Sequence, residues 1–180
     1  MDIREIFSFI KVEHTLFSLP FVLIGYIIAY HQFMDDVSTS VYGWIQIDLV
    51  WILIAAIGAR GLAMALNRII DREIDAANPR TEGRHLASGK MDVKTAWSLA
   101  AIFLLMLLLG AWMLNQVALM MAWLPVLAFV IYPYTKRFTW LCHLWLGLCL
   151  GLAPAGAWVA VAGDVHGWAA ITGMFGTHTE

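Results

Sequence analysis

Long apolar stretches alternate with short polar segments along this sequence. An apolar stretch of roughly 20 residues crosses a bilayer as a helix, because an open strand would leave its backbone groups unsatisfied in lipid. The five predicted spans cover residues 15–33, 49–66, 95–114, 117–134 and 138–162, and residues 168–175 look like the start of a sixth. The pattern therefore predicts an all-α, multi-span transmembrane helical bundle.

The boundary between the third and fourth predicted spans depends on two polar residues. No charged residue lies between Thr95 and Thr135, and this stretch is too long for a single span. Asn115 and Gln116 are adjacent polar residues near its middle. We therefore expect the chain to reverse direction there.

Composition supports a membrane environment. Hydrophobic residues make up 61% of the 180 residues and charged residues only 13%, whereas soluble proteins carry roughly a quarter charged residues. The formal net charge of −2 argues against a nucleic-acid partner. Cys142 and Cys149 lie in one apolar run, which favours two buried thiols over a disulfide or metal pair. The composition thus indicates an integral membrane protein whose partner is the lipid bilayer.

The distribution of basic residues predicts the orientation. Every Lys and Arg except Arg60 lies in one of three polar segments, which alternate with acidic loops that contain neither residue type. By the positive-inside rule these three segments are cytoplasmic, as is the N-terminus, and the membrane is the inner membrane if the source is bacterial. The basic residues are Arg4 and Lys11; Arg68, Arg72, Arg80, Arg84, Lys90 and Lys94; and Lys136 and Arg137.

An amide and two carboxylates recur every four residues where the second predicted span ends. Asn67, Asp71 and Asp75 share one helical face at this spacing. They are hard oxygen ligands, and Mg²⁺ takes one or two carboxylates together with water and substrate phosphate. The alternative is a solvated helix end, where Arg68 and Arg72 form ordinary surface pairs with the two aspartates.

Arg60 is a charge inside the second predicted span, two helical turns before Asn67. A charge within a span is costly and often functional. The guanidinium is placed either to orient Asp71 or to meet an anionic substrate. The alternative is that Arg60 only extends its charge toward the cytoplasmic interface.

A second cationic group follows the fourth predicted span. Lys136 and Arg137 come directly after Tyr132 and Tyr134, with Pro133 between the tyrosines. Basic and aromatic residues are common at a membrane interface for reasons of topology alone. The functional interpretation is that these residues bind diphosphate oxygens from the side opposite the acidic motif.

Taken together, these residues resemble the UbiA family of intramembrane aromatic prenyltransferases, and the N-terminal segment resembles its 4-hydroxybenzoate polyprenyltransferase-like branch. The motifs that carry the resemblance are Asn67-x-x-x-Asp71-x-x-x-Asp75, Asn78-Pro79-Arg80-Thr81, Arg84-x-Leu86-Ala87-Ser88-Gly89, residues 132–137, residues 10–20 and Arg60.

The resemblance implies a nine-span bundle that binds Mg²⁺ between two Asp-rich motifs, one in each half. It implies transfer of a polyprenyl group from polyprenyl diphosphate to an aromatic acid such as 4-hydroxybenzoate in quinone biosynthesis. The implied metal ligands are Asn67, Asp71 and Asp75, and the implied catalytic residues are Asp71, Asp75 and Lys136. The implied substrate-binding residues are Arg60, Asn67, Arg68, Tyr132, Tyr134, Lys136 and Arg137.

The sequence departs from that family pattern in one respect. The second Asp-rich motif follows the sixth span in the family, and residues 1–180 contain no such segment. We therefore expect a single membrane domain, incomplete at its C-terminus, that binds diphosphate weakly and is inactive without a C-terminal half of the same enzyme. Alternatives are a different acceptor, an aminodeoxyfutalosine-type menaquinone precursor, or a non-enzymatic transporter or assembly subunit. His14 and His85 are lesser candidates for contact with an acceptor carboxylate.

Overall fold

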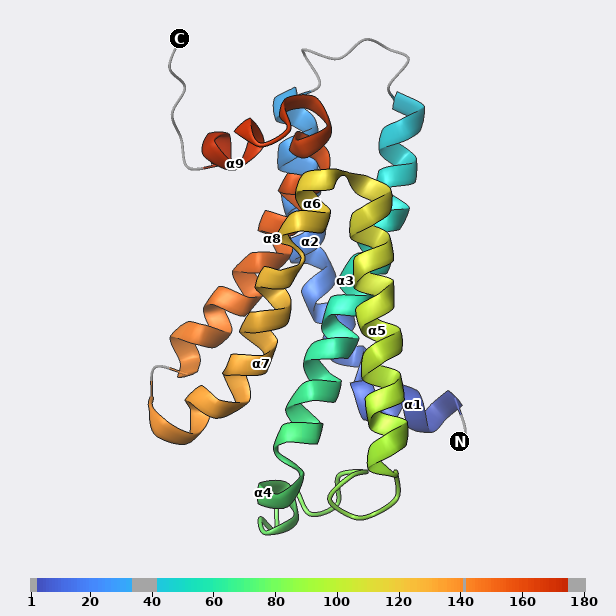
Figure 1. Ribbon diagram of the computed structural model, residues 1–180, viewed down its shortest axis with the longest axis vertical. Helices are drawn as coiled ribbons and strands as arrows, with labels where there is room; N and C mark the ends of the chain where they lie inside the picture. Colours follow the sequence, from blue (N-terminus) through green and yellow to red (C-terminus); the bar gives the residue numbers. More distant parts are fainter. Residues whose placement is uncertain (1–2, 34–41, 141, 175–180) are drawn as a thin grey trace.

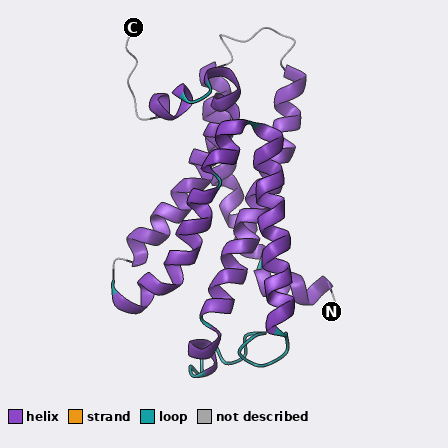
Figure 2. Cartoon of the chain, viewed as in Figure 1, coloured by secondary structure: helices purple, strands orange, loops and turns teal. Residues whose placement is uncertain are grey.

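The computed structural model describes residues 3–33, 42–140 and 142–174, and within these ranges the regular elements are all helices (Figures 1 and 2). They form an elongated bundle in which the longest described connection comprises residues 77–92, between α4 and α5. The helices are α1 (Ile3–Ile10), α2 (Val12–Phe33), α3 (Tyr42–Ile70), α4 (Arg72–Ala76), α5 (Val93–Leu114), α6 (Gln116–Met121), α7 (Trp123–Phe138), α8 (Cys142–His166) and α9 (Ala169–Met174).

Four helical segments in the described part of the chain are long and apolar enough to cross a membrane. They correspond to the second to fifth predicted spans and comprise Ile47–Ile70, Val93–Leu114, Gln116–Phe138 and Cys142–Asp164. The first predicted span is also helical, as α2, but its apolar part is the shorter segment Phe17–Gln32. Most of the predicted start of a sixth span forms the six-residue helix α9, and residue 175 lies outside the described residues.

Two helix pairs build the bundle, α3 with α5 and α2 with α8. Gly58 permits the first contact, because a Cβ atom at this position would lie only 2.6 Å from the backbone nitrogen of Leu107. Gly25 plays the same part in the second pair, where it faces the backbone of Pro154. α7 lies against both α3 and α8 and so connects the two pairs.

Asn115 marks the turn between the third and fourth spans, as the sequence predicted. Its backbone is extended, with φ −162° and ψ 167°, between the end of α5 and the start of α6. The side-chain oxygen accepts a hydrogen bond from the Ala118 backbone at 2.8 Å, and the amide nitrogen donates to the carbonyls of Val159 and Ala160. One residue therefore caps α6 and ties the turn to α8.

Several helix boundaries differ from the sequence-based expectation, and for two of them the structure shows the reason. The second membrane helix continues to Ile70, past the last residue of its apolar run, because its polar end packs against other parts of the protein. The fifth begins at Cys142 and not at residue 138, because Thr139 adopts an extended backbone (φ −152°, ψ 145°) that ends α7. Pro133 does not interrupt α7, which runs through to Phe138.

The basic segments gather at one end of the bundle. The start of α2, the loop between α4 and α5, and the end of α7 all lie at the lower end in Figure 1, whereas α9 and the junction of α5 with α6 lie at the upper end. The acidic motif lies at the same lower end, where α3 is followed by α4.

Candidate functional site

The acidic motif spans a break between two helices. α3 ends at Ile70 and α4 begins at Arg72, with Asp71 between them at φ −94° and ψ 3°. Backbone hydrogen bonds nevertheless keep helical spacing across the break, from Asp71 to the Asn67 carbonyl (3.1 Å) and from Asp75 to the Asp71 carbonyl (2.8 Å). The three side chains of the motif therefore remain in one row.

Two cations from α7 bind the Asp71 carboxylate. Lys136 Nζ donates to Asp71 Oδ2 and also to Asn67 Oδ1 at 2.8 Å. Arg137 Nη2 donates to Asp71 Oδ1 at 3.1 Å and to the Ile70 carbonyl at 3.0 Å. Both oxygens of one carboxylate are thus bound by cations that lie 65 or more residues further along the chain.

Burial makes this contact energetically important. Asp71 is only 1% exposed, and a carboxylate out of water must be paired and hydrogen-bonded to remain ionised. Removing one partner from a buried ion pair typically costs about 3–5 kcal/mol. The Asp71 pairs therefore hold the end of α7 against the end of α3.

The Asp75 carboxylate has a different cation. Arg84 Nη1 donates to both Asp75 oxygens, at 2.8 and 2.7 Å. The Thr81 hydroxyl donates to the Asp75 carbonyl at 3.0 Å and so fixes the loop that carries Arg84. Sequence reasoning used Arg84 only as a position in a motif and did not assign it to the site, although its position in a conspicuous basic loop was a signal.

Aromatic rings accompany the cations of the site. Lys136 lies over the Tyr132 ring, with 5.8 Å from Nζ to the centroid, and Arg137 lies over the Tyr134 ring at 5.2 Å. Cation–π contacts of this kind orient a cation without neutralising its charge. Both tyrosines predicted to bind substrate are therefore neighbours of the two predicted diphosphate-binding cations.

Arg68 is not a surface residue. It is 5% exposed, and its guanidinium carbon lies 5.4 Å from the centroid of the buried Phe9 ring in α1. Only Arg72 forms the kind of exposed pair that the alternative interpretation expected, and its partner is Glu73 at 3.3 Å and neither aspartate of the motif. The acidic motif is thus a partly enclosed cluster and not a solvated helix end.

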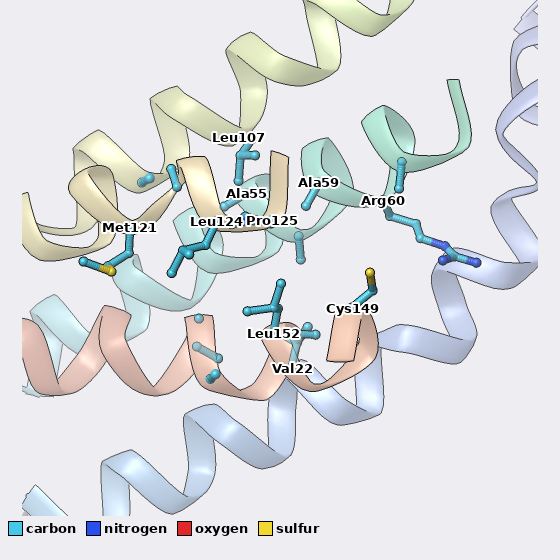
Figure 3. A pocket seen from close by; sticks show the side chains of 18 of the residues that line it. Val22, Ala55, Ala59, Arg60, Leu107, Met121, Leu124, Pro125, Cys149 and Leu152 are labelled. Atoms are coloured by element: carbon cyan, nitrogen blue, oxygen red, sulfur yellow. The ribbon is translucent and has the colours of Figure 1, made fainter. Parts of the chain in front are cut away.

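Arg60 lies where two cavities meet. The larger cavity has a volume of about 400 Å³ and is lined mostly by apolar side chains of the long helices. Figure 3 shows Arg60 at one end of this cavity and Met121 and Leu124 toward the other, with Cys149 on the α8 wall. The Asp71 carboxylate pairs with Lys136 and Arg137 and not with Arg60, so the orienting role considered for Arg60 lacks a contact.

The smaller cavity, of about 190 Å³, is strongly cationic. All of its charged lining residues are basic, and Asn67 and Met64 complete the wall. Lys11 reaches it from the junction of α1 and α2, where φ is 48°, a left-handed conformation that is uncommon outside glycine. The basic lining residues are Lys11, Arg60, Arg68 and Arg84.

His85 belongs to the edge of this region. Its ring meets the Phe9 ring edge-on at 6.2 Å. Burial lowers the pKa of His85, the charges of Arg68 and Lys90 lower it further, and Glu5 opposes them. The imidazole is therefore biased toward its neutral form, which adds no positive charge for an acceptor carboxylate. The side chain of His14 lies outside the described residues.

The oxygen donors of the acidic motif suit a hard divalent cation. Asn67 and Asp71 share the Lys136 ammonium group, and Asp75 lies one helical turn further on with Arg84 as its cation. Among the described side chains no group of three or more His, Cys, Asp or Glu gathers there or elsewhere. Mg²⁺ typically binds proteins through one or two carboxylates and keeps its other positions for water and phosphate. The donor set therefore fits such an ion once the ion pairs to Lys136, Arg137 and Arg84 are exchanged.

Comparison with known proteins gives consistent results. The UbiA prenyltransferase family matches residues 18–180. A 4-hydroxybenzoate octaprenyltransferase of Shewanella woodyi is 32% identical over 117 residues, which are 65% of this chain and 41% of that protein. A protein of the same name from Coxiella burnetii is 34% identical over 106 residues, 59% of this chain and 37% of its own length.

A solved structure also resembles this fold. The apo structure of a UbiA homolog from Aeropyrum pernix K1 superposes with a TM-score of 0.72 at 34% sequence identity, covering 84% of this chain and 51% of that one. The chain thus spans about half the length of this neighbour and less than half of the two relatives above.

Proposed function

The chain belongs to the UbiA prenyltransferase family, and from this premise we propose that it takes part in transferring a polyprenyl group from polyprenyl diphosphate to an aromatic acid such as 4-hydroxybenzoate, with Mg²⁺ as the cofactor. The observation that carries the proposal is the convergence of Asn67, Asp71, Lys136 and Arg137 at the end of an apolar cavity. Oxygen ligands and phosphate-binding cations are both needed to hold a metal diphosphate.

Each of the two cavities suits one of the remaining parts of the substrates. The apolar walls of the larger cavity suit an isoprenoid chain, whose burial there follows the hydrophobic effect. The smaller cavity suits the carboxylate of the acceptor, because Arg60 and Arg68 line it and a guanidinium binds a carboxylate through two parallel hydrogen bonds. Asn67 borders both cavities, so the two substrates meet beside it.

The mechanism follows from this arrangement. In the transfer, the bond between the allylic carbon and the diphosphate oxygen breaks, the bonding pair leaves with diphosphate, and a ring carbon of the acceptor forms the new bond before losing its proton. Lys136 and Arg137 stabilise the negative charge that grows on the leaving diphosphate. Asn67, Asp71 and Asp75 would hold Mg²⁺, which supplies further stabilisation of that charge as a Lewis acid. Tyr132 and the apolar walls of the larger cavity limit access of water to the developing allylic cation.

The orientation and extent of the enzyme are part of the same proposal. The site lies on the cytoplasmic side with the N-terminus, because the basic segments gather there. We also propose that transfer requires residues equivalent to the remaining half of the longer relatives, including a second acidic motif, and that residues 1–180 alone bind diphosphate weakly.

Removal of the metal tests the proposed function. In the full-length protein, reconstituted with polyprenyl diphosphate and 4-hydroxybenzoate, EDTA should abolish formation of the prenylated acid, and added Mg²⁺ should restore it. The measurement is chromatographic quantification of product. Product formation that is indifferent to EDTA would contradict the role assigned to the metal, and no product with any aromatic acid would contradict the reaction itself.

A further inference from the structure

Arg84 belongs to both halves of the site. Its Nη1 group binds both oxygens of Asp75, and the same side chain lines the smaller cationic cavity with Lys11, Arg60 and Arg68. Asp75 itself is 6% exposed, so Arg84 is the cation that compensates this buried carboxylate. One guanidinium thus connects a proposed metal ligand with a proposed anion-binding cavity.

We propose that Arg84 is an exchange residue that couples metal binding to the binding of a small aromatic carboxylate in the smaller cavity. When a divalent cation takes the Asp75 carboxylate, Arg84 leaves it and joins the other cations of the cavity around the anion. This inference rests on the proposed function, since it assumes that Asp75 is a metal ligand.

Charge repulsion drives the first part of the exchange. A divalent ion at Asp75 would lie within a few ångströms of a guanidinium that contacts both oxygens, and like charges at that distance repel strongly in a partly buried site. The metal replaces the charge that Arg84 supplied, so the departure of Arg84 leaves no unpaired carboxylate.

The second part of the exchange needs an anion. Arg84 lines the cavity together with three other basic side chains, so freeing its guanidinium from Asp75 is unfavourable there until an anion is present. The backbone of Arg84 stays in place, since its nitrogen donates to the Thr81 carbonyl (3.0 Å) and its carbonyl accepts from Ser88 (2.8 Å). Only the side chain has to move, and the cavity is already within its reach.

The coupling is reciprocal by thermodynamic necessity. If the metal strengthens binding of the carboxylate by freeing Arg84, the carboxylate strengthens binding of the metal by the same factor. Arg84 differs in this respect from Lys136 and Arg137, whose release from Asp71 would serve the diphosphate. The cations of the two aspartates would then serve the two different substrates.

The test uses the purified chain in detergent micelles, with Mn²⁺ as a paramagnetic ion of similar ligand preference to Mg²⁺. Loss of the free Mn²⁺ signal in electron paramagnetic resonance reports binding, with and without 4-hydroxybenzoate. 4-Hydroxybenzyl alcohol serves as the ligand lacking a carboxylate. The variants are Arg84→Gln, Arg84→Lys and the matched control Arg80→Gln, which removes an exposed arginine from the same loop.

In the wild type, 4-hydroxybenzoate should strengthen Mn²⁺ binding about tenfold, and the alcohol should not. Arg84→Gln should bind Mn²⁺ more tightly than the wild type without the acid, because no cation has to be displaced, and the acid should no longer strengthen it. Arg84→Lys should retain part of the coupling, and Arg80→Gln all of it. Two results would overturn the exchange alone. One is that 4-hydroxybenzoate strengthens Mn²⁺ binding as much in Arg84→Gln as in the wild type. The other is that the wild type binds Mn²⁺ but the acid does not strengthen this binding. No Mn²⁺ binding in the wild type with or without pyrophosphate would overturn the metal site and the exchange together.

Discussion

Replacing Asp71 with Asn should lower prenyl transfer by the full-length protein about a thousandfold. The substitution keeps the shape of the side chain but removes the charge that two cations share, Lys136 at one oxygen and Arg137 at the other. The metal loses a charged ligand, and the two cations lose the partner that positions them for the diphosphate. Initial rates of product formation, measured at saturating Mg²⁺, give the size of the loss.

Glu73→Gln is the matched control for this prediction. Glu73 is a carboxylate two residues further along, in the short helix α4, but it is exposed and its ion pair is with the exposed Arg72. Its removal should leave transfer within about twofold of the wild type, as expected for a surface pair. Because Asp71 is buried, each variant is first checked for retained fold by circular dichroism and thermal unfolding. A folded Asp71→Asn protein with wild-type turnover would contradict the role of Asp71 as a metal ligand and as the residue that positions the two cations.

Replacing Lys136 with Met should lower kcat/KM for polyprenyl diphosphate about a hundredfold. Lys136 joins the end of α7 to both Asn67 and Asp71. Its ammonium group is therefore placed to exchange its contact with the aspartate for a contact with the leaving diphosphate. Met keeps most of the volume of the side chain without its charge. Steady-state kinetics with varied polyprenyl diphosphate would measure the effect.

Lys136→Arg and Lys94→Gln complete this comparison. The arginine variant keeps the charge and should recover part of the activity, although a guanidinium differs in shape from an ammonium group. Lys94 is an exposed lysine in the first turn of α5, so Lys94→Gln should behave as the wild type. Equal kinetics in Lys136→Met and Lys94→Gln would show that Lys136 serves only membrane topology.

The spans were predictable because hydropathy alone determines where a helix can cross lipid. The turn at Asn115 was also predictable, since two adjacent polar residues lie in a long uncharged stretch. In the structure Asn115 caps α6 and is hydrogen-bonded to α8. The predicted ends of the helices were less accurate than the predicted spans. Hydropathy ends the second span at residue 66, but the structure continues α3 to Ile70, because buried contacts of Arg68 and Ile69 compensate for polar residues.

The site was predictable as a set of residue types and less so as a set of pairs. Periodicity placed Asn67, Asp71 and Asp75 in one row, and topology placed Lys136 at the same end of the bundle. The sequence pattern did not predict that Lys136 and Arg137 bind the Asp71 carboxylate directly. Arg84 and Lys11 were missed as site residues because irregular loops bring them to the cavity, and no periodic pattern encodes the path of such a loop.

The most direct test of the central claim, that the row from Asn67 to Asp75 binds a metal diphosphate, is equilibrium binding of Mn²⁺ with inorganic pyrophosphate. The purified chain is compared with the double variant Asp71→Asn plus Asp75→Asn, with free Mn²⁺–pyrophosphate subtracted. We expect pyrophosphate to increase the Mn²⁺ retained by the wild-type chain and to have no such effect on the double variant. Equal retention of Mn²⁺ by the two folded proteins would contradict the claim.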